Sequence, residues 1–458
     1  MTRRRLYQPV PALHTALADH PLLPSRHAAL IFFTIGEGEP AMTDLTPDER
    51  AMTEGRDGPA AAMAMRIVAE TARILGAERL IPVTSAHVDG CLYHGDSGVY
   101  FVERLVELEG RVAVPTTLNV GALDLIHPER VHADPHATDM ARRMMAAYEA
   151  LGCAPTWTCA PYQVGHRPDP GEDVAWGESN AVAFCNSVLG ARTNRNGDFL
   201  DISAALAGRA PYYGLHVADN RLATVVVGTA SLSDRLKAED AFYPVLGAWL
   251  GAEVAGAVAV IDGLPADMPE DRLKALGAGA ASNGAVGLFH VAGVTPEAPT
   301  LEAALGGRPA EQRIELTPEV VRAARDALST APDGPLDALA VGSPHFSIAE
   351  FDALEERLAG RRASRPFYAC TNRQVLRSLE ASGALARIEA AGIEIITDTC
   401  IVVTPILPAG GGVLMTNSAK FAQYTPSNTD YEVVFGSLGD IAESAVAGRV
   451  VRDEAAWN

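Results

Sequence analysis

The sequence has few aromatic residues, an excess of acidic over basic residues, and no long uninterrupted apolar run. Aromatic residues make up 6% of the 458 residues, and the formal net charge is −20. Large nucleic-acid or anionic-membrane surfaces depend on Lys and Arg, so this charge excludes them but leaves room for a local basic pocket. The best apolar stretch, 248–264, contains Glu253 and Asp262, which predicts a buried helix or strand. We expect no nucleic-acid partner and no membrane partner.

Cysteine is also scarce, and its six positions form no CxxC pair. In a chain of this size such spacing is typical of a reducing compartment, which predicts a cytoplasmic location. The sequence has no P-loop, HExxH or GxSxG motif. The stretch "GAGAASNG" at 277–284 begins like a dinucleotide fingerprint, but Ser282 stands where the third glycine belongs. A nucleotide-dependent oxidoreductase is therefore a weak alternative.

Residues 1–41 begin with Arg3, Arg4 and Arg5 and later carry an apolar stretch, but polar residues separate the two and no small-residue cleavage site follows. The acidic and glycine residues at 36–39 back-translate to a purine-rich stretch before Met42, as a ribosome-binding site would. We expect translation to start at Met42, with 1–41 an extension that is disordered or absent. The catalytic module is then predicted to cover 42–458.

From Met42 onward, helical and strand patterns alternate steadily. Thr46, Pro47 and Glu49 predict a helix start with a capping box. Further helices are predicted at 60–75, 139–151, 318–329 and 348–359. Strands are predicted at 80–83, 112–114, 223–227, 338–341, 393–397, 401–404 and 413–415. This alternation predicts an α/β fold with largely parallel sheets.

Polar residues follow five of the predicted strands. In open α/β sheets, ligand groups lie at the carboxyl ends of the strands. Hydroxyl, His, Asn, Cys and Lys side chains occur in the segments 84–98, 115–125, 342–347, 398–400 and 416–426. We expect these five segments to converge on one site.

The same segments resemble a known family. "IPVTSAHVDGCLYHGDSG", "VPTTLNVGALDL", "GSPHFSIAEF", "DTCIVVTP" and "MTNSAKFAQY", with the segment 154–198, are similar to the large subunit of aconitase X. The resemblance runs from about residue 42 to the C-terminus. It implies an aconitase-like, multi-lobed fold and an iron–sulfur hydro-lyase, that is, a dehydratase. Two substrates are known in the family, cis-3-hydroxy-L-proline in bacteria and mevalonate 5-phosphate in archaea.

The hydroxyproline form is favoured, because "HVDGCLYHGDSG" and "SPHFS" resemble it more and because few basic residues cluster as a phosphate site requires. Its product would be 1-pyrroline-2-carboxylate. The alternatives are mevalonate 5-phosphate and another small hydroxy acid. A non-catalytic scaffold without a cluster is an alternative of a different class.

The resemblance implies that the cluster ligands are Cys159, Ser343 and Cys400. The family has cysteine at the middle position, and serine is a harder and less acidic ligand than thiolate. This departure favours a [2Fe–2S] cluster, with [3Fe–4S] and [4Fe–4S] as alternatives. Two other cysteines are conceivable substitutes, Cys91 and Cys370. The remaining two, Cys153 and Cys185, are interpreted as small buried apolar residues.

Dehydration requires a base for the α proton and an acid or metal for the leaving hydroxide. By analogy with aconitase, Ser418 is the predicted base, Lys420 lowers its pKa, and His87 protonates the leaving group. The structural alternatives are a strand-end cap for Ser418 and a solvated surface position for Lys420. The predicted substrate-binding residues are Ser85, Thr116, Thr117, Asn119, His166, Asn180, Arg192 and Asn417. Some polar residues of 154–198 are expected to brace the Cys159 loop instead.

A second polypeptide is also expected. Aconitase X needs a small module, and residues 1–41 are too few to form it. We therefore expect a separately encoded small subunit that closes over the substrate and excludes water from the site.

Overall fold

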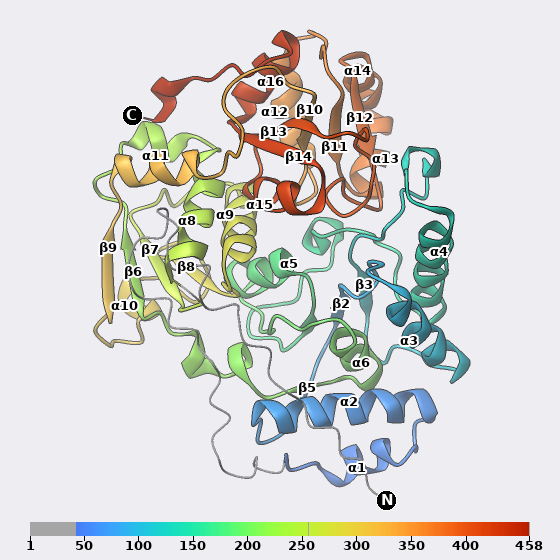
Figure 1. Cartoon of the computed structure of the whole chain (residues 1–458). Helices are drawn as coiled ribbons and strands as arrows, with labels where there is room; N and C mark the ends of the chain where they lie inside the picture. Colours follow the sequence, from blue (N-terminus) through green and yellow to red (C-terminus); the bar gives the residue numbers. More distant parts are fainter. Residues whose placement is uncertain (1–42, 255, 458) are drawn as a thin grey trace, which may run out of the picture. The chain divides into compact units, whose positions relative to one another are not determined.

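The computed structural model describes residues 43–254 and 256–457. The expected extension 1–41 and the expected start at Met42 lie outside the described residues. Within them, helices and short strands alternate along the chain, as Figure 1 shows. The predicted capping box is present, because the Thr46 hydroxyl accepts the Glu49 N–H and the Glu49 carboxylate accepts the Thr46 N–H.

The strands form four sheets among the described residues. The largest is fully parallel, in the order β12-β11-β10-β13-β14, and consists of β10 (Ala338–Val341), β11 (Phe367–Cys370), β12 (Ile393–Ile396), β13 (Gly412–Thr416) and β14 (Tyr431–Phe435). A second parallel sheet, in the order β8-β7-β6-β9, consists of β6 (Val225–Gly228), β7 (Ala259–Asp262), β8 (Phe289–Val291) and β9 (Gln312–Glu315).

The third parallel sheet is small and has the order β3-β2-β4, with β2 (Ala86–Val88), β3 (Thr116–Leu118) and β4 (Ala175–Trp176). The remaining strands, β1 (Leu80–Pro82) and β5 (Arg209–Pro211), form an antiparallel pair. The first, second and third parallel sheets each contribute to a different buried apolar cluster, with Phe367, Ile261 and Val88 respectively. The predicted α/β class with largely parallel sheets is confirmed.

The helices lie between these strands. They are α1 (Pro47–Thr53), α2 (Pro59–Leu75), α3 (Asp96–Glu107), α4 (Pro135–Ala150), α5 (Ser179–Phe184), α6 (Leu200–Ala207), α7 (Asp234–Ala238), α8 (Phe242–Val254), α9 (Glu270–Asn283), α10 (Leu301–Ala304), α11 (Pro318–Asp326), α12 (Ile348–Leu358), α13 (Arg373–Ser382), α14 (Ala384–Ala390), α15 (Ala419–Asn428) and α16 (Leu438–Ala447). No helix in the described ranges combines the length and apolar character that a membrane crossing requires.

The stretch "GAGAASNG" lies almost wholly inside α9, so it does not form a phosphate-binding loop. Its glycines allow α9 to pack closely against α8, beside which it lies in Figure 1. A Cβ atom on Gly279 would lie 2.6 Å from the Pro244 carbonyl oxygen, and one on Gly247 would lie 2.1 Å from the Leu276 carbonyl oxygen. The glycines therefore serve helix packing.

Two of the predicted strands are wrong. The segment 112–114 is irregular, because its amides bond to loop and helix carbonyls; Val112 N–H donates to Leu151 and Ala113 N–H to Ala205. The segment 401–404 forms a turn, since the amides of Val403 and Thr404 both donate to the Cys400 carbonyl. In both places β-branched residues pack in a connection rather than in a ladder.

Candidate active site

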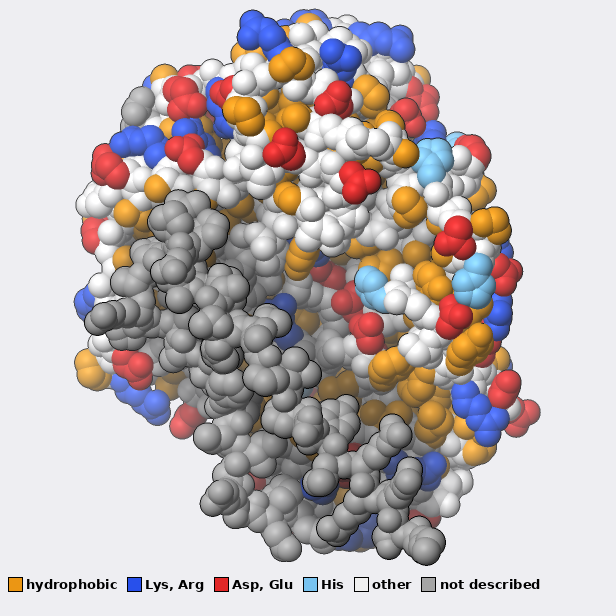
Figure 2. Space-filling view, viewed as in Figure 1, with side chains coloured by type: hydrophobic (Ala, Val, Ile, Leu, Met, Phe, Trp, Pro, Cys, Tyr) orange, Lys and Arg blue, Asp and Glu red, His pale blue; other side chains and the backbone are white. Residues whose placement is uncertain are grey.

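One cavity of about 440 Å³ brings together residues from all five polar segments. Residues that follow β2, β3, β10, β12 and β13 line it, as expected for the carboxyl ends of parallel strands. They include Asp89, Asn119, Ser343, Cys400 and Lys420. The segment 154–198 adds Cys159, Glu178 and Arg195. We call this the site cavity. On the face drawn in Figure 2, acidic, basic and histidine side chains lie around a hollow in the described surface.

The three residues expected to bind iron all line the site cavity. Cys159 and Cys400 are 5% and 6% exposed, and Ser343 is also buried. Ser343 follows Gly342, whose φ is +96° and whose added Cβ would lie 2.1 Å from the Cys370 carbonyl oxygen. Only glycine fits this close approach, so Gly342 fixes the turn that presents Ser343.

The two thiols differ in acidity. Burial raises the pKa of Cys159 to about 12, although the nearby Lys420 cation opposes the shift. Burial also acts to raise the pKa of Cys400, but hydrogen bonds from the Cys370 thiol, the Val402 amide and the Ser343 hydroxyl, together with Lys420, place it below its ordinary value. Cys400 is thus the more readily ionised thiol. Cys370 lies behind it and does not line the cavity.

Lys420 and Glu178 form an ion pair in the cavity wall. Burial works to lower the pKa of Lys420, but Glu178 and Cys159 outweigh it and hold the pKa above its ordinary value. Glu178 has a left-handed backbone, φ +63°, and its carboxylate also accepts the Ala181 N–H at 2.6 Å at the start of α5. The pair therefore holds a fixed cation beside the two thiols. Lys420 is not a surface lysine.

Asp89 is a site residue that sequence reasoning missed, although it lies one position after β2 in the quoted "HVDG" motif. One of its carboxylate oxygens accepts a hydrogen bond from Asn119, and the other has no partner among the described residues. Burial, with the nearby Glu178 charge, raises the pKa of Asp89 to about 7. A carboxyl group with such a pKa can donate or accept a proton near neutral pH. Glu178 was also missed, and its position in 154–198 was the available signal.

Several predicted substrate-binding residues lie outside the cavity lining and are largely buried. The Thr117 hydroxyl lies 2.9 Å from His87 Nδ1 and 2.7 Å from His166 Nδ1, so it joins the two rings. Burial lowers the pKa of both rings, of His166 to about 4. Both Nε2 atoms, and the Ser85 hydroxyl oxygen, are buried without a partner in the described structure.

The remaining predicted residues of this group contact the backbone. Thr116 donates its hydroxyl proton to the Val114 carbonyl at 2.8 Å. Asn180 donates to the Cys159 carbonyl at 3.0 Å, so it braces the Cys159 loop. Arg192 lies on the loop 190–198, where its amide donates to the Glu172 carbonyl at 2.7 Å. Their predicted roles toward a substrate stay predictions.

Ser418 caps α15. Its hydroxyl donates to the Ser343 carbonyl and accepts the Phe421 N–H at 3.1 Å. Asn417 and Ser418 line a crevice of about 30 Å³ with Ser343, separate from the site cavity. The geometry favours the capping alternative, and the base role of Ser418 stays a prediction.

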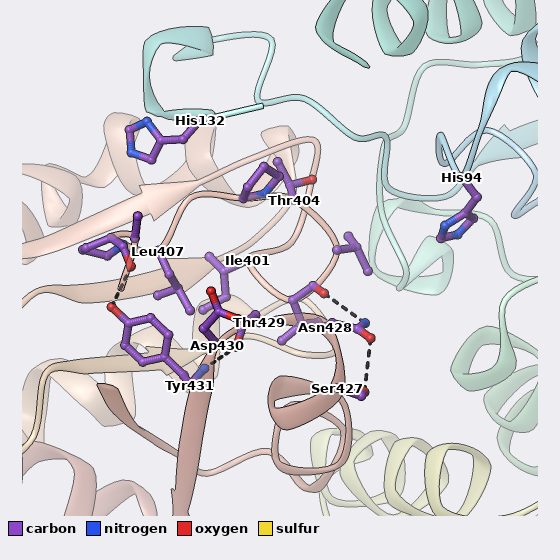
Figure 3. Close-up of a pocket in the computed structure, with 15 residues that line it drawn as sticks. His94, His132, Ile401, Thr404, Leu407, Ser427, Asn428, Thr429, Asp430 and Tyr431 are labelled. Carbon is purple, nitrogen blue, oxygen red and sulfur yellow. Dashed lines mark hydrogen bonds between the residues drawn. The ribbon is translucent and has the colours of Figure 1, made fainter. Parts of the chain in front are cut away.

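A second and larger cavity of about 610 Å³, whose lining Figure 3 draws, adjoins the site cavity. The two share His94, Val402, Val403 and Asn428. We call this larger cavity the outer groove. In its wall, the Asn428 side chain donates to the Val402 carbonyl at 3.1 Å, and the Tyr431 hydroxyl donates to the Pro408 carbonyl at 3.1 Å. The groove therefore continues the site cavity along the turn that follows Cys400.

The donor set fits an iron–sulfur centre in part. Two buried thiols and one hydroxyl line the same cavity beside a fixed lysine cation, and thiolates are the usual ligands of such clusters. Among the described residues, no group of three or more His, Cys, Asp or Glu side chains is placed to hold a metal ion. The assignment of Ser343 as a third ligand stays a prediction.

Comparison with known proteins identifies the family. Models of the first, second and third domains of aconitase X match residues 42–219, 223–326 and 336–447. The chain belongs to the aconitase X family. It is 42% identical over 415 residues to the cis-3-hydroxy-L-proline dehydratase of Pseudomonas aeruginosa, covering 89% of this chain and 71% of that protein. It is 36% identical over 394 residues to the phosphomevalonate dehydratase large subunit of Methanothermobacter thermautotrophicus, and this match covers 84% of this chain and 95% of that protein.

The structure also matches a solved member of the family, the holo-form of Thermococcus kodakaraensis aconitase X, with a TM-score of 0.78 and 33% identity. The match covers 88% of this chain and 100% of that chain. These comparisons confirm the predicted family, the α/β fold and the assignment to the hydro-lyases, since the aconitase X relatives are dehydratases.

Proposed function

We propose that this chain is the large subunit of an iron–sulfur dehydratase that converts cis-3-hydroxy-L-proline to 1-pyrroline-2-carboxylate. The observation that supports this substrate assignment is the 42% identity over 415 residues to a cis-3-hydroxy-L-proline dehydratase. The identity to a phosphomevalonate dehydratase large subunit is lower, at 36%. The cations that line the site cavity, Lys420 and Arg195, suit a single carboxylate better than a carboxylate and a phosphate together.

Cys159, Ser343 and Cys400 would hold the iron–sulfur cluster. A bound cluster would supply Lewis-acid assistance to the departing hydroxyl group. With two thiols and one serine oxygen facing the cavity, a [2Fe–2S] centre is favoured over [3Fe–4S] or [4Fe–4S]. A non-catalytic scaffold without a cluster would also tolerate serine at position 343. The iron content of the purified protein therefore distinguishes the dehydratase from such a scaffold.

Lys420 is placed to bind the substrate carboxylate, because it is a fixed cation that lines the cavity beside the thiols. Asn119 offers an oxygen that is buried and has no partner in the described structure, which suits the ring N–H of a hydroxyproline. Water exclusion around these groups would strengthen both interactions.

Asp89 is the strongest candidate for proton transfer. Its unpartnered oxygen and its raised pKa of about 7 allow the protonated carboxyl to donate to the leaving hydroxyl. The Glu178 carboxylate, bound to Lys420 in the same wall, lies in the same cavity and is a candidate to accept the α proton. This assignment adds a carboxyl acid to the roles first predicted for Ser418 and His87.

A separately encoded small subunit would complete the enzyme in the cytoplasm. The archaeal relatives are named large subunits, and the chain covers 95% of the one from Methanothermobacter thermautotrophicus. The site cavity opens into the outer groove, so a second polypeptide could close over both.

The test is an anaerobic assay of the large subunit, co-expressed with an aconitase X small subunit and purified by size-exclusion chromatography. Formation of the cyclic imine from cis-3-hydroxy-L-proline, with no turnover of mevalonate 5-phosphate, is the expected result. Turnover of mevalonate 5-phosphate alone would overturn the substrate assignment. Full activity of the isolated chain would overturn the need for a partner.

A further inference from the structure

The His345 side chain lies between the two cysteine-bearing loops. It belongs to the turn after β10, two residues beyond Ser343, and is 0% exposed. Its Nδ1 lies 3.0 Å from the Thr158 hydroxyl, next to Cys159 in the chain. Its Nε2 lies 3.3 Å from the Thr399 carbonyl oxygen, next to Cys400. One imidazole ring therefore contacts the residue before each cysteine.

The partners of His345 define its tautomer. A carbonyl oxygen only accepts, so Nε2 carries the proton and donates to Thr399. Nδ1 of the neutral ring then accepts the Thr158 hydroxyl proton, and the Thr158 oxygen accepts the Ala160 N–H at 3.1 Å. Every polar atom of this arrangement has a partner, which fixes the ring in one orientation.

The backbone of His345 adds two further contacts. Its N–H donates to the Cys159 sulfur at 3.3 Å, and its carbonyl accepts from the Lys274 ammonium at 3.3 Å. Lys274 is 1% exposed and is held by Asp271 at 2.8 Å and by Glu350. The turn is thus anchored from behind by a buried charge cluster while its imidazole faces the cysteine loops.

We propose that His345 is a positioning residue that sets the separation of the Cys159 and Cys400 thiols before any cluster is bound. It does so by connecting the three segments that carry Cys159, Ser343 and Cys400, because both nitrogens of its ring form hydrogen bonds. The link to cluster binding rests on the proposed function, whereas the positioning of the two thiols does not. Groups that orient metal ligands in this way change metal affinity by about 10- to 100-fold when they are removed.

The test compares two buried histidines. His345→Phe keeps an aromatic ring but removes both ring hydrogen bonds. His290→Phe is the matched control, because His290 is also buried and its Nε2 also contacts a backbone carbonyl, that of Arg221 at 2.8 Å, in the separate sheet at β8. Alkylation of Cys159 and Cys400 in the cluster-free protein, resolved by mass spectrometry, is compared with iron uptake and the electron paramagnetic resonance spectrum.

In His345→Phe, both cysteines are expected to alkylate about tenfold faster than in His290→Phe, because the loops open more readily. Iron affinity should fall about 10- to 100-fold in His345→Phe and stay unchanged in His290→Phe. If His345→Phe does not fold, Thr158→Val keeps the His345 ring but removes the Nδ1 partner, together with the oxygen that accepts the Ala160 N–H, and it should speed alkylation of Cys159 and alter the resonance spectrum.

Unchanged alkylation and an unchanged spectrum in the folded variant would overturn the inference. If the wild-type protein takes up no iron but the variant still alkylates faster, the cluster proposal fails and the positioning role stands.

Discussion

Two buried histidine arrangements belong to the segments around the site cavity, and they differ in whether their ring nitrogens have partners. His345 uses both nitrogens, one on Thr158 and one on Thr399. His87 and His166 share the Thr117 hydroxyl through their Nδ1 atoms, at 2.9 and 2.7 Å, and both Nε2 atoms lack partners in the described ranges. The first arrangement is complete, whereas the second has two unused polar atoms.

This difference indicates different tasks. The Thr117 hydroxyl has one proton, so it donates to one Nδ1 and accepts from the other. The two neutral rings are therefore opposite tautomers, and one free Nε2 is a donor while the other is an acceptor. Buried polar atoms normally have partners, so this pair suits a bound water or ligand. The complete arrangement connects the cysteine loops, whereas a binding role for the incomplete one stays a prediction.

The largest expected effect on turnover comes from the cysteine loops that His345 connects. Cys159→Ala should abolish turnover and the visible charge-transfer absorbance, because one of only two cavity-lining thiols is lost. Cys153→Ala and Cys185→Ala are the controls, since both cysteines are buried outside the cavity. Retention of absorbance and activity in Cys159→Ala would remove the basis for the iron assignment.

Asp89→Asn should lower kcat by about 10²- to 10⁴-fold, the usual contribution of a general acid or base. The asparagine keeps an oxygen for the hydrogen bond from Asn119 but cannot donate a proton. The cluster spectrum should be unchanged. In the wild type, kcat should fall as the pH rises through about 7, because Asp89 must be protonated to donate. A kcat within tenfold of the wild type would exclude this role.

The same substitution should stabilise the fold at high pH. The pKa of Asp89 is raised by burial to about 7 in the folded protein, above its unfolded value, so its ionisation destabilises the folded state increasingly as the pH rises from about 4 to 7. The Tm of Asp89→Asn should exceed that of the wild type at pH 8, and the two should converge at pH 4. Equal Tm values at pH 8 would contradict the raised pKa.

Thr117→Val breaks the incomplete arrangement. It leaves two buried Nδ1 atoms without their partner, which should cost about 1–3 kcal/mol of stability in chemical denaturation. If the arrangement of His87, Thr117 and His166 binds substrate, KM should rise more than kcat falls. Thr425→Val is the control for a buried threonine, since the Thr425 hydroxyl oxygen has no partner in the described structure. A loss of stability no larger than in that control would show that the two rings do not depend on Thr117.

Ser418→Ala has the smallest expected effect on turnover. As a helix cap it should cost about 1 kcal/mol of stability and leave kcat within about tenfold. The cluster spectrum should be retained. A loss of several orders of magnitude in kcat would instead support the base first predicted from the sequence.

Much of the fold follows from the sequence, because it depends on local patterns. The capping box at Thr46 and the strand 338–341 were predicted from neighbouring residues alone. The strand predictions for 112–114 and 401–404 were wrong, because the amides of 112–114 bond to carbonyls distant in the sequence and those of 403 and 404 bond to the Cys400 carbonyl in a local turn.

The site was predictable where a motif carried it. Cys400, Asn119 and Lys420 line the cavity as their positions after predicted strands suggested, and Cys159 lines it as the family resemblance implied, whereas Asp89 and Glu178 were overlooked. Their significance depends on burial and on partners that are distant in the sequence: Asp89 accepts from Asn119, 30 positions away, and Glu178 pairs with Lys420, 242 positions away. The role of His345 likewise depends on three loops that meet only in the folded protein.

The most direct test of the central claim is the electron paramagnetic resonance spectrum of anaerobically reconstituted protein after one-electron reduction with dithionite, recorded for the wild type and for Ser343→Cys. The wild type should show an iron–sulfur signal, and Ser343→Cys should show a different one, because a thiolate then replaces an oxygen ligand. Absence of any cluster signal from the wild type after reconstitution, or identical signals from the two proteins, would contradict the assignment of Cys159, Ser343 and Cys400 as the cluster ligands.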